Sequence, residues 1–281
     1  MRKRRILAAL LLVIALSLLA LVCLLRAGWS FGGREEPAVP LASEISAPSV
    51  TPEPTPEPTP EPTPEPAPDT RPCVVLDPGH QRCGNPEPEP IGPGAAETKA
   101  KVTGGTEGVA SGLKEYELNL IVALQLREEL SARGYRVVLT RESHDVDLSN
   151  AERAAIAAEA GADVFLRLHA DASDNSGRQG VMSICMTPAN PFHPELYAPG
   201  RTLADRVLDA VTAATGAQSN GVWETDSMSG INWSTVPVII LEMGFMTNPE
   251  EDLRMADPDY QRLLVQGIAD GLDAWFAARS D

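Results

Sequence analysis

The chain has 281 residues, of which 43% are hydrophobic, and a formal net charge of −16. Residues 72–281 hold 31 of the 39 acidic but only 16 of the 23 basic side chains, so this part alone is strongly acidic. An acidic chain without a basic patch repels phosphate polymers, which excludes nucleic acid as a partner.

The first 26 residues have the pattern of a membrane anchor. Basic residues at positions 2–5 precede an apolar run, 6–25, in which Ser17 is the only clearly polar side chain. A helix of this length spans a bilayer, and the basic cluster predicts that the rest of the chain lies outside the cytoplasm. The alternative is a cleaved signal peptide, which would make the protein secreted. We expect the uncleaved anchor, because the run is long for a signal peptide and no A-x-A site follows it.

Residues 27–71 are expected to be a linker between the anchor and a single domain. Positions 51–66 consist of four Thr-Pro-Glu-Pro repeats. Alternate prolines prevent helix and sheet pairing and favour an extended polyproline II spacer. The remainder, 72–281, is about 210 residues long and suits one catalytic domain. The sequence gives no indication of its oligomeric state.

Strands and helices alternate along this domain. Apolar runs predict strands at 73–77, 135–140, 163–168, 181–186 and 236–241. Helical patterns predict helices at 115–132, 149–160, 197–214 and 260–278. Almost continuously apolar strands are typical of a mainly parallel sheet that is buried on both faces. We therefore expect an α/β domain with a mainly parallel or mixed twisted sheet, helices on both sides, and all strand carboxyl ends at one edge.

Residues 81–112 interrupt the alternation. The segment is rich in Gly, Pro, Glu and Thr, shows no apolar periodicity and is predicted to be an extended loop. Loops of this length inside a compact domain are usually functional or disordered. Three interpretations stay open: a border of a substrate groove, a lid over the site, or a disordered surface insertion.

The four cysteines, at positions 23, 73, 83 and 185, contain no C-x-x-C zinc pattern. Cys73 and Cys83 lie on either side of a Pro-Gly turn, and they either form a disulfide or stay free thiols. We favour buried free thiols.

Four potential metal-binding or acid–base groups follow strands or open a helix. His80 comes directly after the strand and turn at 74–79, His169 and Glu242 each end a strand, and Glu115 opens a helix. The carboxyl ends of the strands in an α/β sheet are where ligands bind. Catalytic zinc takes three protein ligands, commonly His and Glu, and keeps a position for water. The sequence therefore predicts zinc ligands at His80, Glu115 and His169, and a general base at Glu242.

Each of these residues has a simpler explanation when it is taken alone. A glutamate at a helix start complements the helix dipole, a single histidine is more often packed, and Glu242 could pair with Arg153. Glu117 is a rival ligand, but it points about 200° away around the helix. The metal interpretation is favoured because all four simpler explanations would have to hold together. His144 and His193 lie in polar loops and are interpreted as surface residues.

Six motifs then occur in a characteristic order: Val75-Leu76-Asp77-Pro78-Gly79-His80, Glu115-Tyr116-Glu117-Leu118-Asn119-Leu120, Leu139-Thr140-Arg141, 148–153, Leu168-His169-Ala170-Asp171-Ala172, and Leu241-Glu242-Met243-Gly244-Phe245-Met246-Thr247-Asn248. With them, essentially all of 72–281 resembles the zinc-dependent N-acetylmuramoyl-L-alanine amidases of the Amidase_3 family. The resemblance implies a peptidoglycan hydrolase that cleaves the amide between the lactyl group of N-acetylmuramic acid and L-alanine of the stem peptide. It implies zinc held by His80, Glu115 and His169, with Glu242 as the catalytic residue.

The sequence departs from the family pattern at several positions. Arg167 and Asp171 stand where the family often has Ser and Asn, and Tyr116-Glu117 replaces a usual Lys-Asp. None of these changes removes a ligand, so their expected effect is on substrate preference. Two other functions stay open. One is a zinc peptidase that cuts elsewhere in the stem peptide. The other is an inactive wall-binding domain, against which the full set of ligands and base argues.

Overall fold

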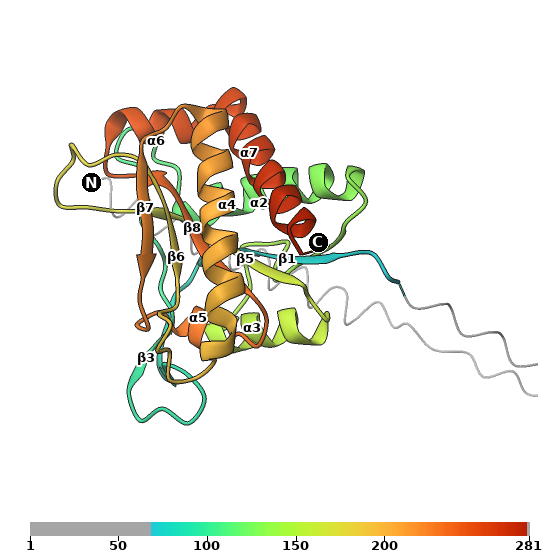
Figure 1. Cartoon of the computed structure of the whole chain (residues 1–281). Helices are drawn as coiled ribbons and strands as arrows, with labels where there is room; N and C mark the ends of the chain where they lie inside the picture. The colour runs from blue at the N-terminus through green and yellow to red at the C-terminus, as the bar shows by residue number, and fades with distance from the viewer. Residues whose placement is uncertain (1–68, 280–281) are drawn as a thin grey trace, which may run out of the picture. The chain divides into compact units, whose positions relative to one another are not determined.

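The computed structural model describes residues 69–279. The predicted anchor at 1–26 and nearly all of the linker at 27–71 lie outside the described residues. Within 69–279, no helix combines the length and the apolar character needed to cross a bilayer. This part of the chain is an α/β domain built on a six-stranded sheet (Figure 1).

The sheet is mixed, and its strand order is β4-β1-β5-β8-β6-β7. The strands are β1 (Cys73–Pro78), β4 (Arg136–Leu139), β5 (Val164–Asp171), β6 (Val181–Cys185), β7 (Ser219–Glu224) and β8 (Val238–Phe245). The four strands β4, β1, β5 and β8 are parallel, whereas β6 runs antiparallel to β8 and β7 runs parallel to β6. The expectation that all strand carboxyl ends share one edge is therefore wrong for β6 and β7. The connection between β5 and β6, residues 172–180, contains no crossover helix, so β6 returns in the opposite direction.

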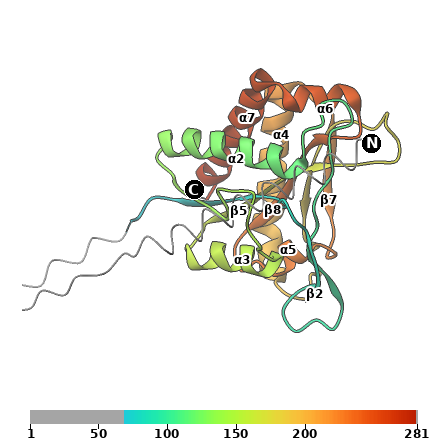
Figure 2. The ribbon, with the colours of Figure 1, turned by 180° about the vertical axis from the view of Figure 1, so that it is seen from behind.

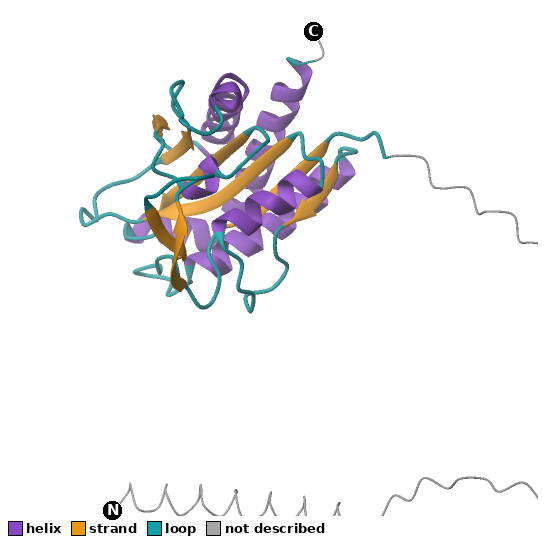
Figure 3. Ribbon diagram, turned by 90° about the horizontal axis from the view of Figure 1, so that it is seen from below, coloured by secondary structure: helices purple, strands orange, loops and turns teal. Residues whose placement is uncertain are grey.

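Helices cover both faces of the sheet, as Figure 3 shows. One face carries α2 (Glu115–Ala132), α4 (Tyr197–Thr215) and α7 (Pro258–Ala277), and the other carries α3 (Asn150–Glu159) and α5 (Ser229–Asn232). A further helix, α6 (Pro249–Ala256), connects β8 to α7, and a 3₁₀ turn, η1 (Pro194–Leu196), precedes α4. The fold class, five of the six strands of this sheet and the four long helices agree with the sequence predictions, whereas β7, α5 and α6 were not predicted.

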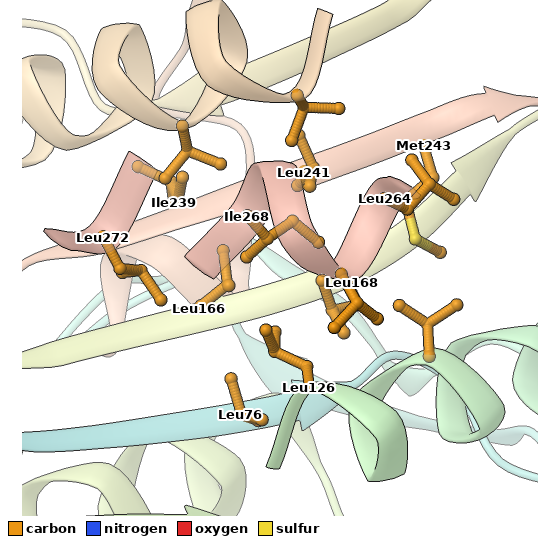
Figure 4. Close-up of a cluster of buried hydrophobic side chains, with 14 of the residues drawn as sticks. Leu76, Leu126, Leu166, Leu168, Ile239, Leu241, Met243, Leu264, Ile268 and Leu272 are labelled. Carbon is orange, nitrogen blue, oxygen red and sulfur yellow. The ribbon is translucent and has the colours of Figure 1, made fainter. Parts of the chain in front are cut away.

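The two faces of the sheet bury two separate apolar clusters. The larger cluster packs under α2, α4 and α7, and Figure 4 shows part of it: Leu76, Leu126, Leu166, Leu168, Ile239, Leu241, Met243, Leu264, Ile268 and Leu272. The smaller cluster lies under α3 and α5 and contains Val75, Phe165, Ile240, Ala157 and Ile231. Because successive side chains of a strand point to opposite faces, the central strands must be apolar at almost every position.

The smaller face changes from apolar to polar toward the carboxyl ends of the strands. Alternate residues share a face, so this face continues as Val75 to Asp77 in β1, Phe165 to Arg167 to His169 in β5, and Ile240 to Glu242 in β8. The strand register therefore brings charged and imidazole side chains together at one edge, next to α3 and α5.

The segment 81–112 is not an irregular loop throughout. It contains an antiparallel hairpin, β2 (Asn85–Pro90) and β3 (Thr98–Val102), which extends beyond the sheet (Figure 2). Prolines alternate through β2 and remove backbone donors, which argues against a strand in sequence reasoning but is tolerated at an edge. The hairpin is fixed to the domain: Trp233 Nε1 donates to the carbonyl oxygen of Pro90 at 2.8 Å, and Asn232 Nδ2 donates to that of Ile91 at 3.0 Å. The interpretation as a disordered insertion is therefore wrong.

Candidate metal centre

His80 lies in a tight turn directly after β1. Its φ of 60° falls in the left-handed region, which a non-glycine residue adopts where the surrounding structure holds it there. Two buried guanidinium groups hold this turn. Arg141 donates to the carbonyl oxygens of Pro78 and Gly79 at 2.9 and 3.1 Å, and Arg153 donates to that of His80 at 3.1 Å. The backbone of the turn thus fixes the direction of the imidazole.

Asp77 anchors both the turn and the neighbouring strands. Its carboxylate is fully buried and accepts from Arg153 Nη1 at 2.6 Å, from Arg167 Nε at 2.8 Å and from the Thr140 hydroxyl at 2.5 Å. Burial by itself raises the pKa of Asp77, but the two arginines outweigh it and hold the pKa far below its usual range. Arg153 therefore pairs with Asp77, and the alternative of an Arg153–Glu242 pair is wrong.

Glu115 reaches the same edge from the start of α2. Its side chain is buried; Oε2 accepts the backbone N–H of Thr106 at 2.9 Å, and Oε1 accepts that of Ala170 at 3.2 Å. The rival ligand Glu117 points elsewhere, since its carboxylate accepts the backbone N–H of Lys114 at 3.2 Å in a capping box. Glu117 therefore caps the helix, and Glu115 is available as a ligand.

The three predicted ligands come together. Glu115 Oε1 lies 2.9 Å from His80 Nε2 and 3.2 Å from His169 Nδ1, and the two imidazole nitrogens are 3.1 Å apart. The carbonyl oxygen of Thr103 lies 2.9 Å from His80 Nδ1 and can only accept. His80 therefore donates from Nδ1, which leaves the lone pair of Nε2 directed at the other two groups.

These groups fit a zinc ion. A tetrahedral ion with bonds of about 2.0–2.1 Å separates its ligand atoms by about 3.3 Å, which is close to the measured distances. Burial lowers the pKa of His169 to about 4, so its ring is in the neutral form that binds metal. Burial alone would raise the pKa of Glu115, but its hydrogen bonds with His169 and His80 bring it below the usual range, which favours the carboxylate. Two neutral imidazoles and one carboxylate are a common ligand set for catalytic zinc.

Glu242 stands beside the ligand group on the adjacent strand. In the parallel pairing of β5 and β8 it lies directly opposite His169, so both side chains point to the same face. Burial raises the pKa of Glu242 well above its ordinary value, with repulsion from Glu115 and Asp171 adding to the effect and Arg167 opposing it. Its Oε2 is buried and has no hydrogen-bond partner among the described residues. An unpaired buried carboxyl with a raised pKa is suited to proton transfer.

A cavity of about 300 Å³ opens over this constellation. The predicted residues in its lining are His80, His169 and Glu242. The remaining walls come from three places: β3 and its neighbour Thr103, the strand and helix residues Asn150, Arg167 and Ile240, and residues 227–230 before and within α5. The segment 81–112 therefore forms one wall of the cavity, as the substrate-groove interpretation predicts.

The other residues singled out in the sequence lie outside the ligand group. His144 and His193 were expected at the surface but are half-buried; the His144 ring meets that of Tyr116 edge to face with centroids 5.2 Å apart, and His193 contacts Glu195 at 3.2 Å. Cys73 and Cys83 are both free; the sequence favoured buried free thiols, which is confirmed for Cys73 but wrong for Cys83, since that thiol is exposed.

Several residues at the site were not predicted from the sequence. Thr103 orients His80, while Lys99 and Asn150 line the cavity. Asn150 follows the capping serine of α3 and offered no signal beyond its place in a family motif. Thr103 and Lys99 lie in the segment without periodicity, so no pattern indicated which of its residues turn inward.

A His–Glu–His group that could hold a metal ion, next to an unpaired carboxyl at the mouth of a cavity on an α/β sheet edge, is an arrangement typical of hydrolases. The match to known families is more specific than this class. The family model described as N-acetylmuramoyl-L-alanine amidase, Amidase_3, matches residues 74–274, and the chain belongs to this family.

Curated relatives agree with this assignment. The N-acetylmuramoyl-L-alanine amidase LytC of Bacillus subtilis (strain 168) is 31% identical over 170 residues, covering 60% of this chain and 32% of LytC. The probable cell wall amidase LytH of Staphylococcus aureus is 27% identical over 209 residues, covering 73% of this chain and 58% of LytH. The chain thus spans about a third of the first relative and under two thirds of the second.

Solved structures share the fold. Ami1 of Mycobacterium smegmatis, an N-acetylmuramyl-L-alanine amidase, has a TM-score of 0.67 at 23% identity, covering 74% of this chain and 97% of that one. The apo form of Ami1 from Mycobacterium abscessus has a TM-score of 0.66 at 25% identity, covering 73% and 98%. The described domain thus shares its fold with these chains over nearly their whole length.

Proposed function

We propose that this protein is a zinc-dependent peptidoglycan hydrolase. It cleaves the amide bond between the lactyl group of N-acetylmuramic acid and L-alanine of the stem peptide. Family membership supports the reaction class. The observation that carries the proposal is the convergence of His80, Glu115 and His169 within hydrogen-bond distance, with Glu242 opposite His169 in the strand register.

The side chains of this site have separate roles in the proposal. His80, Glu115 and His169 would hold a zinc ion, which would supply Lewis acidity toward the attacking water and the scissile carbonyl. Thr103 keeps His80 in the tautomer that presents Nε2. Glu242 takes the proton of the attacking water and returns it to the leaving amine of L-alanine. Its raised pKa supports the first step, because a carboxylate with a higher proton affinity is a stronger base toward the water, and the group then keeps the proton until the amine takes it.

Digestion of purified sacculi tests the proposed reaction. The full chain, loaded with zinc, should release intact stem peptides with a new N-terminal alanine and leave glycan strands with free lactyl carboxylates, both identified by mass spectrometry. Peptides cut inside the stem would instead indicate a zinc peptidase. An absence of all products, with zinc bound, would indicate an inactive wall-binding domain.

Metal analysis tests the ligand set independently of activity. The wild-type chain should bind one zinc ion, and His169→Ala should lose most of it. His144→Ala is the matched control, because that imidazole lies outside the ligand group, and it should bind zinc as the wild type does. Equal zinc content in all three proteins would contradict the assignment.

We also propose that residues 1–26 anchor the protein in the cell membrane with the amidase domain outside the cytoplasm. The support is the basic cluster followed by the apolar run 6–25. Fractionation tests it: the full chain should sediment with membranes and resist high salt, whereas a chain lacking residues 1–26 should be soluble. Processing to a shorter secreted form would indicate a signal peptide.

A further inference from the structure

The cavity beside the candidate metal centre has an unusual charge for this acidic protein. Of the described residues that line it, Arg167 and Lys99 carry positive charges, and Glu242 is the single carboxylate. The two cations lie on different elements, Arg167 on β5 at the floor and Lys99 on β3 of the hairpin. A cationic lining inside a domain with twice as many acidic as basic residues indicates selection of an anionic group.

Arg167 is held firmly and keeps part of its guanidinium unused. Its Nε donates to Asp77 at 2.8 Å and its Nη2 donates to Asn150 Oδ1 at 2.7 Å. Within residues 69–279, its Nη1 has no hydrogen-bond partner, although the side chain is only 4% exposed. A guanidinium that is fixed through two of its nitrogens presents the remaining N–H groups in a defined direction, which suits recognition of a carboxylate.

Gly230 makes room for this guanidinium. A Cβ atom at position 230 would lie 1.4 Å from Arg167 Nη1, so any larger residue at the start of α5 would displace it. Gly230 itself lines the cavity. Arg167 Nη1 therefore packs against the backbone of Gly230 with no side chain at that position between them, and both residues line the cavity.

The positive charge near the floor is not neutralised by the protein. Three arginines, Arg141, Arg153 and Arg167, are buried here: Arg153 and Arg167 share the buried carboxylate of Asp77, and Arg141 bonds only backbone carbonyl oxygens, among them those of Pro78 and Gly79. Glu115 and Glu242 balance a bound divalent cation. The buried arginines therefore exceed the remaining carboxylate by two charges, and a buried excess of this kind favours an anionic ligand.

Lys99 adds to this excess at the rim. Its Nζ donates to the backbone carbonyl oxygen of Ser227 at 2.7 Å, and it forms no ion pair with any described carboxylate. Its cross-strand neighbour Glu89 points away, since that carboxylate accepts the backbone N–H of Ala151 at 3.3 Å. The lysine is thus held at the cavity by a neutral partner, the carbonyl oxygen of Ser227.

We propose that this cavity binds a free carboxylate of the stem peptide, and that Arg167, assisted by Lys99, makes the enzyme selective for it. This inference rests on the proposed amidase function. The second residue of the stem is a glutamate that is joined through its side chain, so its α-carboxyl is either free or amidated. That group lies one residue beyond the alanine, within about 7 Å of the scissile amide. Arg167 is therefore a specificity-determining residue for the non-amidated stem.

A pair of substrates that differ in one group tests the proposal. Muramoyl tripeptides with a free or an amidated α-carboxyl at the second residue are isosteric, and the full zinc-loaded chain is assayed on both. The wild type should prefer the free acid by about 10- to 100-fold in kcat/KM, mainly through KM, because the amide places an N–H group against the guanidinium. Arg167→Gln should lower kcat/KM more on the free acid than on the amide and so reduce the preference, whereas Arg167→Lys should keep part of it.

Two further measurements test the same preference without relying on Arg167→Gln. Lys99→Gln should reduce the preference by several-fold, and Lys101→Gln, an exposed lysine on the same strand paired with Glu87, is the matched control that should not change it. Equilibrium binding of both muropeptides to Glu242→Gln, which should not turn them over, gives the same comparison without catalysis. This measurement decides the question if Arg167→Gln does not fold.

The outcomes separate the two proposals. Equal kcat/KM on both substrates by the wild type, or a preference that survives Arg167→Gln, overturns the carboxylate site and leaves the amidase function standing. An equal loss on both substrates in Arg167→Gln, with zinc content unchanged, assigns Arg167 to structure and also overturns it. Failure of the wild type to cleave the lactyl amide of either substrate contradicts the proposed function itself.

Discussion

Replacing Gly79 with alanine tests how the turn after β1 positions the metal ligands. A Cβ atom at this position would lie 2.3 Å from Cε1 and Nε2 of His169 and 2.7 Å from its Nδ1. Carbon contacts need about 3.5 Å, so the imidazole must move by about 1 Å. The φ of Gly79 is not in the left-handed region, and its backbone therefore accepts alanine without strain. The change acts on the ligand, not on the turn.

The expected effects on metal binding and on folding differ in size. A ligand displaced by about 1 Å should weaken zinc binding by about 10- to 100-fold and lower kcat/KM by about 100-fold. Overpacking should cost about 1–3 kcal/mol of unfolding free energy. For a domain of this size that lowers Tm by roughly 2–4 °C per kcal/mol. The protein should therefore stay folded while losing most of its activity.

Zinc competition with a chromogenic chelator and steady-state hydrolysis of a muropeptide measure the two effects, and thermal unfolding checks the fold. Gly104→Ala is the matched control, because a Cβ there meets nothing within 4 Å and its φ is not in the left-handed region. It should behave as the wild type. If Gly79→Ala binds zinc within about threefold of the wild type and keeps its turnover, His169 is not held as the structure indicates.

Three further outcomes are expected. Glu242→Gln should keep its zinc and its stability but lose about 10²- to 10⁴-fold in kcat; loss of zinc instead would make Glu242 a ligand. In Glu242→Gln without metal, the unfolding free energy measured by urea should fall as the pH drops from 6.5 to about 4. The reason is that His169 becomes protonated over this range in the unfolded chain but stays neutral in the folded chain, where its pKa is lowered. The total loss is at most about 3 kcal/mol, and a rise in stability over this range would contradict the prediction. Replacing the hairpin tip, 91–97, by a two-residue turn should raise KM several-fold with kcat nearly unchanged if the hairpin is a groove wall, whereas a gain in activity would indicate a lid.

Much of the fold could be predicted because its signals are local. Continuous apolar runs identified the central strands, and the capping pair of Ser149 and Glu152 marked the start of α3 as the structure has it. The candidate ligands were found for a related reason: His80 follows β1 and His169 lies near the carboxyl end of β5, and parallel strands bring such positions to one edge.

Other features depend on partners that no local pattern specifies. The reversed direction of β6 follows from a connection without a helix and from β8 entering the sheet between β5 and β6. The β2–β3 hairpin exists despite its prolines because Trp233 and Asn232 hold it from more than 130 residues away.

The sequence by itself determined the fold class, the four residues of the candidate centre and the family, because each rests on side-chain types at fixed spacings. Only the tertiary structure decided what surrounds those residues. Arg153 and Arg167 both form ion pairs with Asp77, and the carbonyl oxygen of Thr103, next to the hairpin, accepts a hydrogen bond from His80. The physical reason is that a buried charge takes the partner that the whole packing brings within reach, and that choice is made between segments far apart in the chain.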